Sequence, residues 1–127
     1  MAEIRKRYSD EDLAEFKQII DEKLERARRD YADMMRALRN DEGNDVADTS
    51  PTYKILEEGS TAQNKAELIV LAQRQQKFIQ GLEAALVRIA NKTYGIDRMT
   101  GELIPKERLR AVPHATLSVE SKMKKNH

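Results

Sequence analysis

Apolar residues recur every three or four positions from Leu13 to Leu38, and this spacing constrains the fold more than any other feature. Neither Gly nor Pro interrupts residues 9–41. A period of about 3.6 residues places these side chains on one face of a single helix, roughly 50 Å long. Ser9, with Asp12 three residues later, is a typical N-cap for that helix. The residues on this face are Leu13, Phe16, Ile20, Leu24, Ala27, Tyr31, Met34 and Leu38.

Residues 61–91 predict a second long helix. Its apolar seam has heptad spacing with a polar position at Gln75. Two helices that each carry one narrow apolar stripe bury those stripes most simply by packing antiparallel. We therefore expect a mainly α fold, in which residues 1–92 form a long antiparallel helical hairpin, a coiled coil. The seam residues are Leu68, Leu71, Gln75, Phe78, Leu82, Ala85 and Ile89.

The connection between the two helices, residues 41–60, is rich in turn formers and acids. Residues 41–58 hold six acids and one base, whereas residues 88–127 hold nine bases and four acids. The net charge of +1 therefore conceals an acidic hairpin tip and a basic opposite end. Such a charge distribution orients a protein in the field of a charged partner.

Residues 93–127 predict a small separate unit. Two short strands, 94–96 and 102–104, flank a turn at Thr100-Gly101, and Pro105 begins a short helix that Pro113 ends. So small a unit cannot bury enough surface to fold alone without a metal or a disulfide. We expect it to pack on the hairpin base through Leu86, Ile89 and Tyr94.

Several classes of function are disfavoured by composition. The chain has no Cys, two His and no Gly-rich phosphate loop, so an enzyme is not expected. Near-zero net charge and few aromatics argue against direct, specific nucleic-acid binding, although the basic end gives it some support. Since no long apolar run or leader occurs, we predict a cytoplasmic protein without a membrane span. The bases concerned are Arg108, Arg110, Lys124 and Lys125.

The C-terminal half carries a family resemblance. Residues 82–89, 93–97, 100–105, 108–113 and 117–122 resemble the DksA/TraR family of bacterial transcription factors. The resemblance covers about the last 60 residues closely and the first helix only by architecture. It implies a helical hairpin on a small zinc-finger globule, which inserts the hairpin into the secondary channel of RNA polymerase.

The zinc site of that family reads C-x2-C-x17-C-x2-C. At this spacing the chain has Asp97, Thr100, Ser118 and Ser121. One carboxylate and three hydroxyls do not replace four thiolates, so zinc is predicted absent. We expect a degenerate zinc-finger-like α+β globule held by apolar packing and hydroxyl hydrogen bonds. The alternative is a metal site of other ligands, helped by His114 or Glu120.

The family's tip motif is Asp-x-x-Asp-x-Ala. Here Asp45 and Asp48 match its two acids, and Ser50 stands in place of the Ala. The resemblance implies that these residues lie near the polymerase active centre, where a carboxylate would act on the metal or on basic residues. The alternative is that they only favour turns and solvate a loop.

Two bases match further positions of the family. Arg74 falls where an Arg docks on the polymerase rim, and Lys122 falls where a Lys helps to bind guanosine tetraphosphate. A second Lys of that nucleotide site corresponds to Gly81 here. The alternative for both bases is ordinary solvated helix charge.

The function expected from these observations is regulation of transcription initiation by a protein that binds polymerase and does no chemistry itself. A coiled-coil adaptor without a polymerase role is the alternative. A monomer or a weak homodimer is expected, the latter through Ile19, Met35, Ile69 and Val70.

Overall fold

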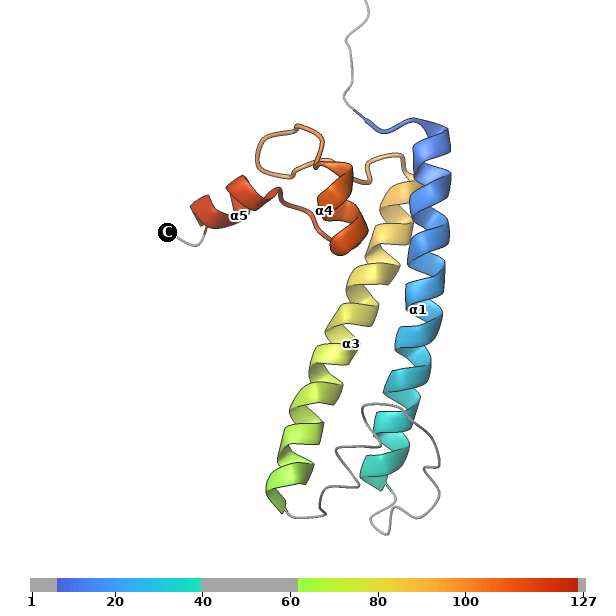
Figure 1. Ribbon diagram of the computed structural model, residues 1–127, viewed down its shortest axis with the longest axis vertical. Coiled ribbons are helices and arrows are strands. Elements are labelled where there is room, and N and C mark those ends of the chain that lie inside the picture. Colours follow the sequence, from blue (N-terminus) through green and yellow to red (C-terminus); the bar gives the residue numbers. More distant parts are fainter. Residues whose placement is uncertain (1–6, 40–61, 126–127) are drawn as a thin grey trace, which may run out of the picture. The chain divides into compact units, whose positions relative to one another are not determined.

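The computed structural model describes residues 7–39 and 62–125, and in these ranges it is mainly helical (Figure 1). The prediction of a mainly α fold is confirmed. The helices are α1 (Asp10–Arg39), α3 (Ala62–Ala90), α4 (Lys106–Ala111) and α5 (Val119–Lys125). None of these described helices is long and apolar enough to cross a membrane.

The start of α1 follows the predicted cap. The Asp12 N–H donates to the Ser9 hydroxyl at 3.1 Å, and the Leu13 N–H donates to the Ser9 carbonyl at 2.9 Å. Acids at Asp10, Glu11 and Asp12 occupy the first turn, where they stabilise the positive end of the helix dipole. The N-cap prediction is therefore confirmed.

Two compact units make up the structure, and each contains a part of both long helices. The second unit consists of the described residues from Leu24 to Gln80. Within it, α1 and α3 lie side by side and run in opposite directions (Figure 1). The Gln75 amide of α3 donates to the Ala27 carbonyl of α1 at 3.0 Å. The buried apolar residues of this unit are Leu24, Ala27, Ala37, Leu68, Ala72 and Ile79.

The predicted seam is only partly correct in this unit. Ala72 and Ile79 are buried, whereas Leu71 and Phe78 are half-buried. On α1, Ala37 is buried and its predicted neighbour Leu38 is half-buried. A straight helix has 3.6 residues per turn, so a strict seven-residue repeat drifts around its surface and the buried position changes.

The first unit joins the described residues up to Lys23 with those from Gly81 onward. Phe16 of α1 lies at its centre, with ring centroids 5.3 Å from Tyr94 and 5.7 Å from Tyr8. The C-terminal segment thus packs on the base of the helices, as its small size predicted. The buried apolar residues are Tyr8, Leu13, Phe16, Ile20, Leu82, Ala85, Ile89, Tyr94, Ile104, Leu109, Ala115 and Leu117.

The two short strands predicted in the C-terminal segment are reduced to one antiparallel bridge between Ile96 and Leu103. The Ile104 N–H donates to the Gly95 carbonyl at 2.7 Å, and no longer ladder forms in the described residues. Pro105 follows directly, and its missing N–H ends the pairing. Pro105 precedes α4 as predicted.

Tyr8 belongs to the core, with only 7% of its surface exposed, and the sequence analysis did not predict this. Its ring lies against Gly95, where a Cβ would come within 2.7 Å of two ring carbons. Gly95 also has a φ of +81°, which favours glycine. The Tyr8 hydroxyl donates to the Ile104 carbonyl, which attaches the residues before α1 to the C-terminal segment.

Candidate functional site

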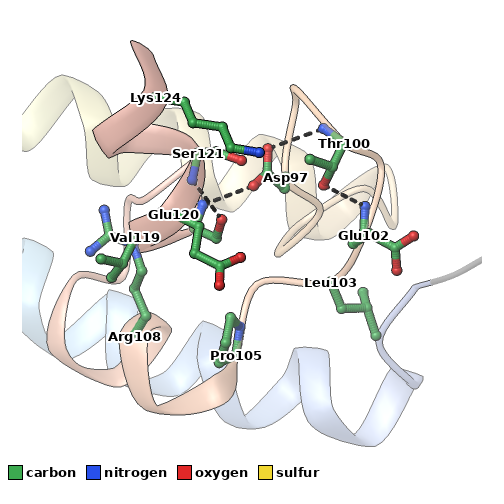
Figure 2. A pocket seen from close by; sticks show the side chains of 11 residues that line it. Asp97, Thr100, Glu102, Leu103, Pro105, Arg108, Val119, Glu120, Ser121 and Lys124 are labelled. Carbon is green, nitrogen blue, oxygen red and sulfur yellow. Dashed lines mark hydrogen bonds between the residues drawn. The ribbon is translucent and has the colours of Figure 1, made fainter. Parts of the chain in front are cut away.

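The four positions that match the family's zinc ligands lie together. Asp97 Oδ1 accepts hydrogen bonds from the Met99 N–H at 2.7 Å and the Thr100 N–H at 3.3 Å. Asp97 Oδ2 accepts one from the Ser118 N–H at 3.0 Å, and the Ser121 hydroxyl also bonds the carboxylate. Figure 2 shows Asp97 between the Thr100 turn and the start of α5. One carboxylate therefore joins two segments of the C-terminal chain.

Local hydrogen bonds fix the backbone around Asp97 and around Ser118. The Gly101 N–H donates to the Asp97 carbonyl at 2.8 Å, and the φ of +76° at Gly101 closes that turn. On the other segment, the Ser121 N–H donates to the Ser118 hydroxyl at 3.1 Å. Ser118 therefore caps α5, a role that the sequence interpretation missed although Ser is a common N-cap residue.

Asp97 is a buried anion, with 1% of its surface exposed. Burial raises the pKa of its carboxyl, but the hydrogen bonds from Ser121, Ser118 and Met99 outweigh burial. They hold the pKa well below its usual range. The carboxylate is therefore ionised at neutral pH, and N–H and O–H donors compensate its charge.

These residues do not fit a zinc ion. Both carboxylate oxygens of Asp97 already accept backbone hydrogen bonds, and the hydroxyls of its neighbours are poor zinc ligands at neutral pH. In the described ranges, His, Cys, Asp and Glu form no group of three or more that could hold a metal. The absence of zinc itself stays a prediction.

A pocket of about 400 Å³ opens beside Asp97 (Figure 2). Its charged lining holds three acids, Asp97, Glu102 and Glu120, and two bases, Arg108 and Lys124. Glu120 lines it, but His114 lines a different pocket, so the structure does not bring both suggested helper ligands to Asp97.

Lys122 lines that second pocket, which has a volume of about 280 Å³. Arg108, His114 and Lys125 also line it, and none of its lining residues is acidic. His114 lies directly over Gly81, where a Cβ would be 3.1 Å from its Cδ2 atom. The imidazole therefore occupies the space into which a side chain at position 81 would extend.

Arg74 is exposed on α3 in the second unit. It lines a shallow pocket of about 450 Å³ together with Gln73, Lys77 and other residues of the same helix. The tip residues Asp45, Asp48 and Ser50 lie outside the described residues.

Comparison with known proteins bears on the fold. No family model matches the sequence, and no curated protein matches it. Among solved structures, the chain matches the transcription factor DksA2 from Pseudomonas aeruginosa with a TM-score of 0.69 and 24% identity. The match covers 90% of this chain and 82% of that chain.

The chain has the fold of DksA2. This result confirms the family resemblance at the level of the fold. On the DksA2 fold, the present chain bonds Asp97 to the backbone of two segments and stacks His114 on α3. Neither contact was predicted, because each depends on backbone atoms that only folding brings close.

Proposed function

We propose that the protein is a bacterial transcription regulator that binds RNA polymerase. It inserts its helical hairpin into the secondary channel, modulates initiation and performs no chemistry itself. The observation that carries the proposal is the fold shared with a transcription factor over 90% of this chain. The identity of the partner comes from the sequence resemblance, and such a regulator acts in the cytoplasm.

The C-terminal segment acts in this proposal as a degenerate zinc-finger-like globule without zinc. Support comes from Asp97, whose carboxylate bonds the turn at Met99 and Thr100 as well as Ser118. Apolar packing of Tyr94 against Phe16 supplies the second support. The globule gives the hairpin a stable base without a metal.

In this proposal, Asp45 and Asp48 act at the active centre, with Ser50 beside them, and Arg74 docks on the polymerase surface. Arg74 is exposed and free to reach a partner. Lys122 is the contact proposed for a guanosine tetraphosphate effector. Its pocket is basic, but the chain supplies Gly81 and the His114 ring where the family has a second Lys.

The double variant Asp45→Ala/Asp48→Ala tests the tip. We expect it to bind bacterial RNA polymerase as the unmodified chain does and to lose the effect on initiation in a purified transcription assay. The matched control is Glu57→Ala/Glu58→Ala, which removes the same charge from the same segment and should keep regulation. Unchanged regulation by the tip variant would disprove the tip assignment.

Arg74→Ala tests docking. We expect it to weaken association with core polymerase by about tenfold, equivalent to about 1.4 kcal/mol, in a pull-down at two salt concentrations. Lys77→Ala, one turn along the same helix, is the control and should bind nearly as well. If affinity capture from a bacterial cytosol recovers no polymerase subunits, the adaptor alternative replaces this proposal.

A further inference from the structure

The solvent-exposed side of α3 carries a second stripe of residues with heptad spacing. Its positions follow one another in steps of three and four, and every one of them is exposed. The buried residues of α3, such as Leu68, Ala72 and Ile79, occupy other positions of the repeat. Heptad spacing is the pattern by which one helix packs lengthwise on another. The stripe consists of Ala66, Ile69, Gln73, Gln76, Gln80, Glu83, Val87 and Ala90.

This side of α3 exposes large apolar side chains, and α1 does not. Ile69 and Val70 are each 45% exposed and Val87 is 58% exposed, whereas α1 has no exposed large apolar residue in its described range. Of the four residues expected to support a homodimer, Ile19 and Met35 prove to be half-buried on α1. The apolar surface that remains for a partner on the long helices therefore belongs to α3.

The hollow of about 450 Å³ around Arg74 has the residue spacing of a packing site for a helix. In knobs-into-holes packing, four residues at i, i+3, i+4 and i+7 form the hole that receives one side chain of the facing helix. The lining of the hollow contains two successive sets with this spacing. They are Val70, Gln73, Arg74 and Lys77, and then Gln73, Gln76, Lys77 and Gln80.

We propose that this side of α3 binds the same side of a second copy of the chain, with the two α3 helices antiparallel. In this arrangement Ile69 lies opposite Val87 of the second copy, and Val87 lies opposite its Ile69. Between these two apolar layers, Gln76 lies opposite Gln80 of the second copy, where the amides exchange hydrogen bonds. The surface is thus complementary to itself, as a two-fold dimer requires.

Charge complementarity favours the antiparallel arrangement. Between Glu67 and Glu83, α3 has no acid, and Arg74 and Lys77 lie in the middle of that stretch. The antiparallel register brings Glu83 of the second copy within about one turn of Arg74 and Lys77, and it does so twice in each dimer. A parallel register would instead place Glu83 opposite Glu83 and Arg74 close to Arg74. Like charges at such positions oppose pairing.

The dimer should be weak, because polar side chains in the layers of a coiled coil reduce its stability while they fix its register. It covers the hollow around Arg74, so a second copy and polymerase would compete for this side of α3. That consequence rests on the proposed function, whereas the dimer itself does not. Failure of the dimer would leave the proposed function untouched.

Sedimentation equilibrium of the full chain from about 1 µM to about 1 mM tests the dimer. We expect a reversible monomer–dimer equilibrium whose dissociation constant rises at least about tenfold in Ile69→Lys and in Val87→Lys. Both positions are exposed, so the variants should fold, and thermal unfolding checks this. Ala32→Lys, at an exposed position of α1, is the matched control and should dimerise as the unmodified chain does.

Disulfide crosslinking tests the register, because the natural chain has no Cys. Positions 69 and 87 lie about 27 Å apart along one helix, so only the antiparallel dimer brings them together. Under mild oxidation, a mixture of Ile69→Cys and Val87→Cys chains should give mixed dimers, and neither variant alone should crosslink comparably. The proposal is overturned if the chain stays monomeric up to about 1 mM or if the Lys variants dimerise normally. Self-crosslinking of either Cys variant as fast as the mixture would also overturn it.

Discussion

Asp97 joins two segments of the C-terminal chain with hydrogen bonds, at the position where the resemblance places a zinc ligand. Its Oδ1 atom accepts a hydrogen bond from the Met99 N–H. Its Oδ2 atom accepts one from the N–H of Ser118, which lies 21 residues away in sequence. Hydrogen bonds to a charged group contribute about 1.5–3 kcal/mol each, less than a structural zinc site contributes in total. A short side chain with two acceptor oxygens can therefore partly replace a metal crosslink.

Asp97→Asn should lower the free energy of unfolding by about 2–3 kcal/mol at pH 7, because an amide nitrogen would face a backbone N–H. The ordinary pKa is 3.8 and the folded pKa is lower, so this stabilisation is complete above pH 3.8 and decreases progressively as the pH falls from 3.8 through the folded value. Urea unfolding at pH 7 and below pH 4 measures both effects, and the variant should have the flatter acid profile. Glu107→Gln, at an exposed carboxyl of α4, is the control. Equal stability of the Asp97 and Glu107 variants would contradict this account.

Gln75 makes a polar contact across the apolar seam between the two long helices. Gln75 is half-buried and donates to the Ala27 carbonyl at 3.0 Å, 48 residues away in sequence. Around it, Ala72 and Ile79 are buried, whereas Leu71 and Phe78 are half-buried. A polar side chain at such a position favours one helix register over the alternatives.

Gln75→Ala should lower the free energy of unfolding by about 1 kcal/mol, because the hydrogen bond and the packing of the side chain stem are lost. Gln76→Ala is the matched control, since Gln76 is exposed on the same helix and its loss should change stability by less than about 0.5 kcal/mol. Guanidinium unfolding of both variants makes the comparison. Equal effects at the two positions would mean that the Ala27 contact contributes nothing measurable.

For the protein as a whole, stability should come from apolar packing rather than from a metal. Tyr8, Phe16 and Tyr94 form one aromatic cluster between the start of α1 and the C-terminal segment. Ion pairs link the same parts, with distances of 2.8 to 3.5 Å, but they are exposed or half-exposed and contribute little. These pairs are Lys92–Asp10, Lys106–Asp12 and Arg110–Glu15.

A chelator should leave the thermal midpoint of the natural chain unchanged, because no thiolate is present to bind zinc. The control is a variant in which all four clustered positions become cysteine. That variant should bind zinc stoichiometrically and lose stability when the chelator removes it. A chelator-dependent drop in the natural chain would restore the metal-site alternative. The substitutions are Asp97→Cys, Thr100→Cys, Ser118→Cys and Ser121→Cys.

The sequence by itself determined the two long helices, the Ser9 cap and the short helix after Pro105, and the family resemblance identified the cluster of Asp97, Thr100, Ser118 and Ser121. The helices and the cap depend on local spacing, which a single sequence displays directly. Only the tertiary structure decided which neighbours of the heptad seam are buried, that Tyr8 packs on Gly95, and that His114 lies on Gly81. These contacts depend on the path of backbone segments far apart in sequence. The path of these segments is set by how the whole apolar surface packs, and no local sequence pattern predicts that path.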